Sequence, residues 1–275
     1  ELEKISSIPN SLIDTGGLKI YTSFNKNLQT TLENSINKNM TDDDLQVASV
    51  VIDPKTGNVM ALAGGRDYTK SQFNRVSTMK RQVGSTMKPL LYYAALENGM
   101  TSSSTFLSQE TTFVFSNNQT YSPSNYNNTY GNKNITMAAA IAYSENIYAV
   151  KTHLFLGEEN LVEMLKRVGV NSKLEAIPSL ALGSEEITLI EMVSSYGTLA
   201  SGGYKTDTHF IKKIEDSNGN VLYEKKSEKE QVLNSSLVYI TNEMLTSTYN
   251  YNFVDYNYPT CYDLTSKLTK KYGVK

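Results

Sequence analysis

Two copies of the sequence Ser-Thr-Met-Lys lie close together in this chain, one at residues 77–80 and one at residues 85–88. A serine hydroxyl is a weak nucleophile unless a neighbouring base accepts its proton. On a helix, residues i and i+3 share a face, so a lysine amine can reach a serine oxygen one turn earlier. The lysine must also be partly desolvated, because burial lowers its pKa and favours the neutral amine. The pattern therefore indicates a serine nucleophile with a lysine base.

The context of the second copy suits this chemistry. Gly84 permits a tight backbone entry before Ser85, and Pro89 after Lys88 is tolerated only in the first turn of a helix. The apolar run LLYYAALENG (90–99) continues that helix and is expected to bury the surroundings of Lys88. The alternative for Ser85 is a helix cap without catalytic work.

The first copy lacks this context. Lys80 is followed by Arg81, Gln82, Val83 and Gly84, a mainly polar stretch that ends in a helix-breaking glycine. Its amine is therefore expected to stay solvated. We therefore interpret Ser77 as a polar residue of a connecting loop. The same spacing also occurs at Ser23 and Ser35, so spacing alone identifies nothing.

Several strands and helices must position these residues. Alternation predicts a strand over 18–24, and two hairpins are predicted over 47–65 and 209–225. Predicted helices cover 25–40, 135–157 with a break near Ser144, 159–169, 185–203 and a stretch from Asn234 to about Thr248. Residues 1–17 are polar, and residues 100–134, rich in Ser, Thr, Asn and Tyr, are predicted to form a long surface loop. Strands segregated from helices indicate an α+β layered domain.

Composition excludes several function classes. The 275 residues suffice for one large domain or two small ones, and a net charge of −2 without a long basic run disfavours nucleic acid binding. Cys261 is the single cysteine, so no intrachain disulfide is expected. His153 and His209 lack neighbours at ligand spacing, so no metal site is predicted. No apolar stretch approaches ~18 residues, so no membrane span is predicted.

The stretch RQVGSTMKP (81–89) resembles the R-x-P-G-S-x-x-K-P box of penicillin-binding protein transpeptidases, above all the bifunctional class A enzymes. Val83 stands where proline is usual. Further resembling segments are GGLKIYTSFNKNLQ (16–29), VVIDPKTGNVMALAGG (50–65), SQFNR (71–75), SPSNYNNTYGN (122–132) and LALGSEEITLIEMVSSYGTLASGGY (180–204). The first of these is similar to the segment that links the glycosyltransferase and transpeptidase domains.

The resemblance implies a fold and a domain organisation. The fold is the α+β penicillin-binding transpeptidase or serine β-lactamase-like fold, an antiparallel sheet packed with helices. Residues 1–45 would form the linker segment and residues 46–275 a C-terminally incomplete transpeptidase domain, lacking its last strands and terminal helix. A glycosyltransferase domain and a membrane anchor are expected outside this chain.

The second motif of the family, S-x-N, matches Ser144-Glu145-Asn146 at the break in the predicted helix. The resemblance implies that Ser144 relays a proton toward the leaving group, and that Asn146 binds the substrate's peptide and holds Lys88. The alternative for Ser144 is a helix-interior serine bonded to its own backbone. The same word occurs at Ser23, Ser35 and Ser116, so its context carries the assignment.

The third motif, K-[ST]-G, is spelled by residues 55–57, but this copy precedes the nucleophile and lies in a predicted hairpin turn. We reject it. The stretch PTCYDLTSKLTKKYGVK (259–275) resembles the lead-in to the motif, which makes Lys275 its lysine and a substrate-binding residue. We therefore expect the chain to be a fragment, or the ordered part of a longer protein. The resemblance implies that Ser85 supplies one oxyanion amide and the segment past Lys275 the other.

The activity implied is serial acyl transfer in bacterial cell wall synthesis, at the extracytoplasmic face of the membrane. Lys88 would deprotonate Ser85, which attacks the D-Ala-D-Ala carbonyl of a peptidoglycan stem peptide, and an amine of a second stem would take the acyl group. Penicillin and other β-lactam antibiotics would acylate the same serine. No metal or organic cofactor is implied, and the cell wall synthesis machinery is the expected protein partner.

Three alternatives stay open. A serine β-lactamase shares the fold and the first motif, but it needs a deacylating base that we do not find in the sequence. A non-catalytic wall-binding or sensor module would bind stem peptides without turning them over. An inactive fragment of the same fold is the third alternative.

Overall fold

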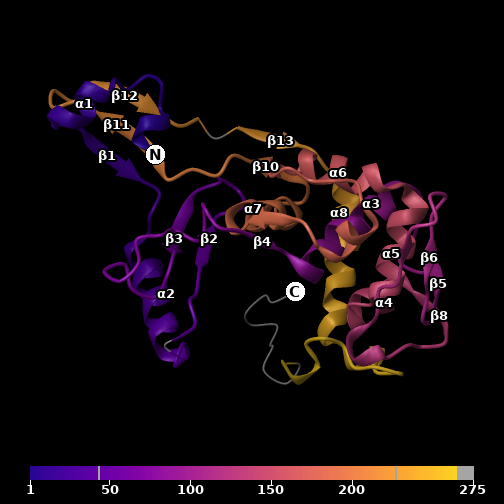
Figure 1. Cartoon of the computed structure of the whole chain (residues 1–275). Helices are drawn as coiled ribbons and strands as arrows, with labels where there is room; N and C mark the ends of the chain where they lie inside the picture. Colours follow the sequence, from indigo (N-terminus) through magenta and orange to yellow (C-terminus); the bar gives the residue numbers. More distant parts are fainter. Residues whose placement is uncertain (43, 227, 265–275) are drawn as a thin grey trace. The chain divides into compact units, whose positions relative to one another are not determined.

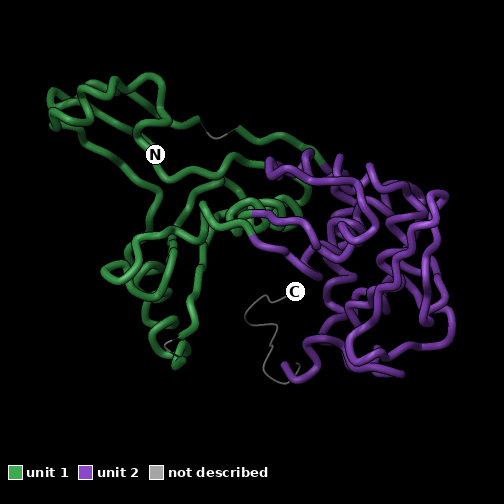
Figure 2. Tube along the Cα trace, in the orientation of Figure 1, with its two compact units in different colours: residues 1–80, 188–232 green, residues 81–187, 233–275 purple. Residues whose placement is uncertain are grey.

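The computed structural model describes residues 1–42, 44–226 and 228–264 (Figure 1). The chain divides into two compact units, drawn in separate colours in Figure 2. Unit 1 comprises residues 1–80 and 188–232, and unit 2 comprises residues 81–187 and 233–275. Each unit therefore joins two stretches that lie far apart in the sequence.

Unit 1 contains a three-stranded antiparallel sheet. Strand β1 (Lys19–Thr22) pairs with β11 (Ile211–Glu215), which pairs in turn with β12 (Val221–Glu224). The predicted strand and the predicted second hairpin are confirmed. Asp216 holds the turn, because its carboxylate accepts hydrogen bonds from the backbone N–H groups of Asn218 and Asn220.

Residues 1–17 carry more structure than their polarity indicates. They contain the 3₁₀ helix η1 (Leu2–Lys4) and the short helix α1 (Asn10–Thr15). Between them Ile8, only 4% exposed, packs with Ile211 and Ile214 of β11. Elements this short leave no periodic signal in the sequence, so only the packing reveals them.

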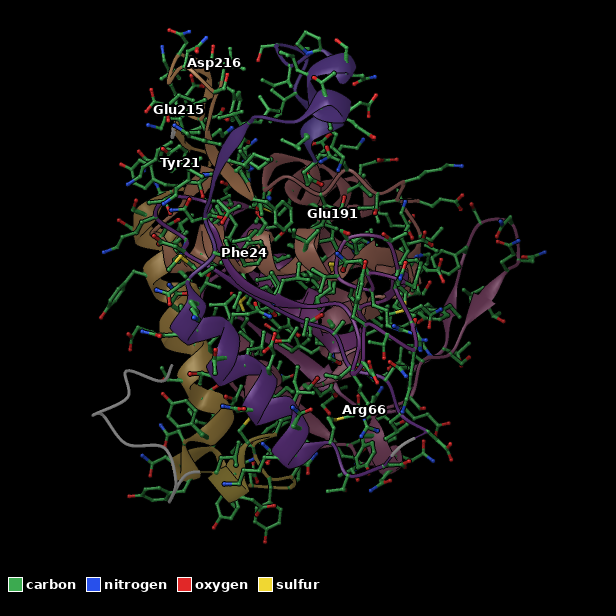
Figure 3. The ribbon with its side chains drawn as sticks, turned by 90° about the vertical axis from the view of Figure 1, so that its left-hand side faces the viewer. Tyr21, Phe24, Arg66, Glu191, Glu215 and Asp216 are labelled. Atoms are coloured by element: carbon green, nitrogen blue, oxygen red, sulfur yellow. The ribbon has the colours of Figure 1, made fainter. Side chains whose placement is uncertain are left out.

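The outer face of this sheet carries a small polar cluster (Figure 3). The Tyr21 hydroxyl donates to Glu215 Oε2 (2.9 Å), and Lys213 Nζ lies 2.7 Å from Glu215 Oε1. The Lys213 amine also lies 4.5 Å from the centre of the Tyr21 ring. Such exposed pairs stabilise a fold only modestly, by about 1 kcal/mol or less.

The first hairpin consists of β2 (Ser49–Ile52) and β3 (Val59–Ala63), paired antiparallel as predicted. The rejected Lys-Thr-Gly copy forms its turn. Asp53 accepts from Lys55 N (2.9 Å) and from Thr56 Oγ1 (2.8 Å), and Gly57 has a positive φ of 78°. These residues are occupied in making the turn, which agrees with the rejection.

The remaining elements of unit 1 include two helices. Helix α2 (Lys26–Asn39) contacts β3 and is capped by Asn25, whose side chain accepts from Asn27 N and Leu28 N. Helix α7 (Leu189–Ala200) is shorter than the predicted helix over 185–203, since β9 (Glu186–Thr188) precedes it and pairs with β4 (Lys80–Gln82). Strands β10 (Tyr204–Thr206) and β13 (Lys229–Gln231) form a separate antiparallel pair.

Unit 2 is built mainly of helices. They are α3 (Lys88–Glu97), α4 (Met137–Tyr143), α5 (Asn146–Leu156), α6 (Glu158–Arg167) and α8 (Ser235–Leu245), with η2 (Gly84–Met87), η4 (Pro178–Leu182) and η5 (Thr246–Tyr249) between or after them. The break in the predicted helix at Ser144 is confirmed, as is the Asn234 cap of α8. The core centres on α3, α5 and α6, where Tyr92 and Tyr148 are fully buried with their rings edge to face.

The prediction of a loop over residues 100–134 was wrong in part. Strand β5 (Thr105–Ser108) pairs antiparallel with β8 (Lys133–Thr136), and β6 (Phe113–Val114) pairs with β7 (Thr120–Tyr121). A short 3₁₀ turn, η3 (Tyr126–Asn128), lies before β8. Ladder hydrogen bonds join backbone groups, so a stretch rich in Ser, Thr and Asn can pair without a hydrophobic signature.

The last described elements are η6 (Tyr251–Phe253) and η7 (Tyr262–Leu264). Lys275 lies outside the described residues, so its assignment stays a prediction. Among the described helices, none has both the length and the apolar character that crossing a bilayer requires.

Candidate active site

Ser85 lies at the entrance to helix α3. It is exposed in the 3₁₀ turn η2, and the α-helix begins three residues later, with Pro89 in its first turn. The turn is held from outside by Gly183, whose carbonyl oxygen accepts from Gly84 N (3.1 Å). A Cβ atom at Gly183 would lie 2.2 Å from the Gly84 oxygen, so only glycine permits this approach. The entrance is thereby fixed by backbone contact.

Lys88 is buried, with 3% of its surface exposed, and its amine contacts the second motif. Nζ donates to the Ser144 backbone oxygen (2.5 Å), to Ser144 Oγ (3.1 Å) and to Asn146 Oδ1 (2.6 Å). These three acceptors use all three N–H donors of an ammonium group. The structure therefore brings together three of the predicted site residues, from two segments of the chain.

Burial of Lys88 disfavours the charged form of its amine. Desolvation lowers the pKa of Lys88 from 10.5 to about 7, although the Glu145 carboxylate raises it. The amine is therefore present in substantial part in its neutral form near pH 7. This is the state that a lysine base requires.

The second motif occupies the break between α4 and α5. Ser144 ends α4 in the left-handed conformation (φ 54°, ψ 46°), which costs a residue other than glycine roughly 1–2 kcal/mol. Strained backbone of this kind clusters at functional sites. The bend turns the Ser144 carbonyl toward Lys88 and lets Asn146 begin a new helix.

The contact between Ser85 and Lys88 is made through the backbone. Lys88 N donates to the Ser85 carbonyl oxygen, as expected for residues one turn apart. The side-chain contact between Ser85 Oγ and Lys88 Nζ stays a prediction. The rejected Ser77 lies in an exposed turn of unit 1, with its hydroxyl 3.5 Å from Thr78 Oγ1, and Lys80 is exposed as well.

The side chains that support the second motif were not predicted from the sequence. Asn125, 8% exposed, accepts from Asn146 N (2.8 Å) through Oδ1 and donates to Glu145 Oε1 (2.8 Å) through Nδ2. The Ser124 carbonyl accepts from Asn146 Nδ2 (2.7 Å). One signal was available for Glu145, namely a carboxylate within a strongly apolar segment. No sequence signal distinguished Asn125 from the other asparagines in the same polar stretch.

The histidines do not suggest a metal centre. Among the residues that the structure describes, no group of three or more His, Cys, Asp or Glu side chains is placed to hold a metal ion. His153 is fully buried, its Nε2 lies 3.1 Å from the Ile177 oxygen, and burial lowers its pKa.

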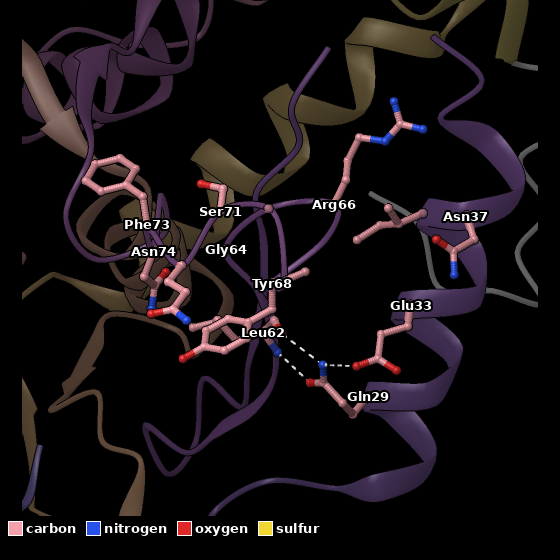
Figure 4. A pocket seen from close by; sticks show the side chains of 14 residues that line it. Gln29, Glu33, Asn37, Leu62, Gly64, Arg66, Tyr68, Ser71, Phe73 and Asn74 are labelled. Carbon is pink, nitrogen blue, oxygen red and sulfur yellow. Dashed lines mark hydrogen bonds between the residues drawn. The ribbon is translucent and has the colours of Figure 1, made fainter. Parts of the chain in front are cut away.

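Unit 1 contains a cavity of about 440 Å³ between α2 and the end of β3 (Figure 4). The Gln29 side-chain amide bonds both backbone groups of Leu62, as a paired strand would. It accepts from Leu62 N and donates to Leu62 O, both at 2.9 Å. Tyr68 and Phe73 line the cavity as well. The four described site residues, Ser85, Lys88, Ser144 and Asn146, do not line it.

A comparison with protein families matches residues 47–257 to the penicillin binding protein transpeptidase domain. Penicillin-binding protein 2D of Bacillus subtilis is 45% identical over 277 aligned residues, covering 100% of this chain and 40% of that protein. Penicillin-binding protein 1A of Aquifex aeolicus is 41% identical, covering 69% of this chain and 26% of that protein. The chain thus spans less than half the length of these curated relatives.

Solved structures show the same fold. Penicillin-binding protein 1A of Haemophilus influenzae superimposes with a TM-score of 0.75 at 24% identity, covering 82% of this chain and 38% of that one. PonA1 of Mycobacterium tuberculosis, solved in complex with penicillin V, gives a TM-score of 0.75 at 22% identity, covering 90% of this chain and 67% of that one. The predicted fold class is confirmed.

Proposed function

Because this chain belongs to the penicillin-binding protein transpeptidase family, we propose that its complete domain is a serine D,D-transpeptidase that cross-links peptidoglycan stem peptides. One observation carries the assignment of roles: the buried Lys88 amine, with a pKa lowered to about 7, bonded to Ser144 and Asn146. Burial lowers the pKa of this amine far enough for it to accept a proton near neutral pH, which an ordinary lysine cation does not do.

The first step acylates Ser85. Its oxygen attacks the carbonyl carbon of the penultimate D-Ala, and its proton passes to Lys88 Nζ. The C–N bond to the terminal D-Ala then breaks, and the leaving nitrogen takes a proton. Ser144 is placed to pass that proton on, because its hydroxyl lies 3.1 Å from the Lys88 amine. The products are an ester on Ser85 and free D-Ala.

The second step transfers the acyl group. An amine of a neighbouring stem peptide attacks the ester carbonyl and gives up a proton to Lys88, which is neutral again after the first step. The new amide bond forms, the bond between the carbonyl carbon and the Ser85 oxygen breaks, and that oxygen takes the proton from Lys88. The Ser85 amide would stabilise the oxyanion in both steps, with a second donor from the segment past Lys275. The Asn146 side chain would contact the substrate's peptide.

The proposal extends to ligands and location. β-Lactam antibiotics would acylate Ser85 and stay bound, because the ring-opened product has no leaving group that diffuses away. The site would work at the extracytoplasmic face of the bacterial membrane, together with other parts of the cell wall synthesis machinery. A β-lactamase is the rival enzyme, and it would hydrolyse the same ester rapidly.

Labelling with a fluorescent penicillin, followed by mass mapping of the labelled peptide, tests the proposal. Two proteins would be compared, the chain ending at Lys275 and a chain extended through the third motif. We expect a stable adduct on Ser85 of the extended chain, lost in Ser85→Ala and retained in Ser77→Ala. Label on another residue, or an ester that hydrolyses within minutes, would contradict the transpeptidase assignment. Folding of Ser85→Ala would be checked by thermal unfolding.

A further inference from the structure

The proposed chemistry leaves one buried charge without a role. Glu145, the middle residue of the second motif, is 2% exposed. An ionised carboxylate costs several kcal/mol or more to bury unless other groups compensate it. In this chain three hydrogen-bond donors converge on it.

The three donors hold both carboxylate oxygens. Oε1 accepts from Ser108 Oγ (2.6 Å) and from Asn125 Nδ2 (2.8 Å), and Oε2 accepts from Tyr148 N (2.5 Å). Ser108 Oγ itself accepts from Gly131 N (3.0 Å), so its proton is directed at Glu145. A glutamine amide would set its NH₂ group against one of these donors. The site therefore suits a side chain whose two terminal atoms both accept hydrogen bonds.

Two further features compensate the charge. Glu145 is the N-cap of α5, where the free backbone N–H groups and the helix dipole favour a negative group. The Glu145 carboxylate also acts on Lys88 and Lys151. Burial lowers the pKa of each amine, and the negative charge raises it in part. The Lys151 amine donates to the Leu107 carbonyl oxygen (2.7 Å) and does not pair with Glu145 directly.

A continuous path of hydrogen bonds connects Glu145 to Lys88. Glu145 Oε1 holds the Asn125 amide, and Asn125 Oδ1 accepts from Asn146 N (2.8 Å). Asn146 Oδ1 in turn accepts from Lys88 Nζ (2.6 Å). The groups in each link are at least partly buried. A movement of the Glu145 side chain would therefore displace Asn146 Oδ1, which binds the lysine.

No other described group is set to take over this electrostatic role. Burial keeps the nearby tyrosines of α3, α4 and α5 neutral, and Glu97 of α3 pairs with Arg167 of α6. The ionisable side chains on the elements packed against α3 are Tyr92, Tyr93, Glu97, Tyr143, Tyr148, Lys151, His153, Glu158, Glu159, Glu163, Lys166, Arg167, Tyr239 and Glu243. None of these side chains alters the pKa of Lys88 through its charge, whereas the Glu145 carboxylate does.

We infer that Glu145 is a positioning residue for acylation, because it fixes, through Asn125, the motif that binds Lys88. Its charge also favours the protonated form of the lysine. The inference rests on the proposed function. It assigns a separate task to a residue that contacts neither the nucleophile nor the base.

The test is the pH profile of acylation by a fluorescent penicillin, using the chain extended past Lys275. The second-order rate constant would be measured from about pH 5 to about pH 9. Four proteins are compared: the unaltered chain, Glu145→Gln, Glu145→Asp and Asn125→Ala. Each profile is normalised to its own plateau, so a lower fraction of folded protein does not alter the midpoint.

Glu145→Gln removes the charge, so the midpoint of its acid limb should move to lower pH. Glu145→Asp keeps the charge but shortens the reach, so its midpoint should stay while its plateau falls by about 10²-fold. Asn125→Ala breaks the path to Asn146 and should also lower only the plateau. A merely structural role would lower plateaus in all three variants without moving any midpoint.

The outcomes separate the two hypotheses. If the unaltered chain is not acylated, or if Ser85→Ala is still labelled, the proposed function fails. If the unaltered chain is acylated and the Glu145→Gln midpoint is unchanged, only the role of the charge is overturned. Should Glu145→Gln not fold, a full plateau in Glu145→Asp or Asn125→Ala would overturn the positioning role.

Discussion

At the scale of single residues, the surroundings of Lys88 act on its charge in opposite directions. Three acceptors, on Ser144 and Asn146, favour the ammonium, and so does the Glu145 carboxylate. Burial favours the neutral amine and prevails, which brings the pKa to about 7. The protonation state of Lys88 therefore depends on several opposing effects rather than on one contact.

This balance predicts how acylation depends on pH. Lys88 accepts a proton only when it is neutral, so the rate should rise with pH and reach half its plateau at about pH 7. In Asn146→Asp a carboxylate would replace the neutral amide 2.6 Å from Nζ and favour the ammonium. Its half-maximum should therefore move to higher pH. The measurement is β-lactam acylation against pH, and a profile that falls with rising pH would exclude Lys88 as the base.

At the scale of elements, the site is formed at the N-termini of two helices, α3 and α5, which other parts of the chain hold in place. The bend between α4 and α5 presents Ser144 to Lys88, and Gly183 after η4 supports the turn that carries Ser85. Both are backbone features, since one is a left-handed serine and the other a glycine at φ 68°. Substitutions far from the chemistry can therefore displace it.

Gly183→Ala tests the entrance to α3. Its added Cβ would lie 2.2 Å from the oxygen and 2.4 Å from the nitrogen of Gly84, and backbone cannot rotate away as a side chain can. We expect acylation to slow by about 10²-fold, because Ser85 is displaced. Gly99→Ala is the matched control, with φ 88° but nothing within 4 Å of the added atom.

The control should lose roughly 1–2 kcal/mol of stability from its left-handed backbone and keep its rate of acylation. Both variants would be measured by thermal unfolding and by the second-order rate of β-lactam acylation. Equal rates in the two variants would show that the contact with Gly84 does not position the nucleophile.

At the scale of the whole molecule, each compact unit combines segments from two parts of the chain. The four described site residues, Ser85, Lys88, Ser144 and Asn146, all belong to unit 2. The family match over residues 47–257 includes parts of both units. The site is thus formed within one unit, while the family's sequence signature extends over both.

Burying Lys88 should also leave a signature in global stability. Its pKa is about 7 in the folded chain and has its ordinary value of 10.5 when unfolded, so between these values the unfolded state binds more protons. The contribution of Lys88 is least favourable below pH 7, and stability rises with pH through this window. The full change is on the order of a few kcal/mol.

Chemical unfolding near pH 7 and near pH 10, for the unaltered chain and for Lys88→Met, measures this contribution. The unaltered chain should gain more stability with rising pH than the variant does, since only the variant lacks the titrating amine. The comparison of the two pH dependences removes the other titrating groups. Equal dependences would mean that Lys88 is not desolvated in the folded chain.

The local parts of this protein could be predicted from short stretches of sequence. Both hairpins, the strand at 18–24 and the helix break at Ser144 are encoded by neighbouring residues, because turns, caps and periodicity act over a few positions. The distinction between Ser77 and Ser85 was local too, since glycine, proline and an apolar run surround only the second serine.

The groups that surround the lysine come from distant segments, so they could not be predicted before the fold was known. Lys88 meets residues 56 and 58 positions away, and Glu145 meets Ser108 37 positions away. Contacts of this kind depend on how helices and strands pack, which no short pattern specifies. The pairing of β5 with β8 was missed for the same reason, because backbone groups far apart in the chain form it. The charge balance at Lys88, and with it the proposed mechanism, is therefore a property of the packed fold.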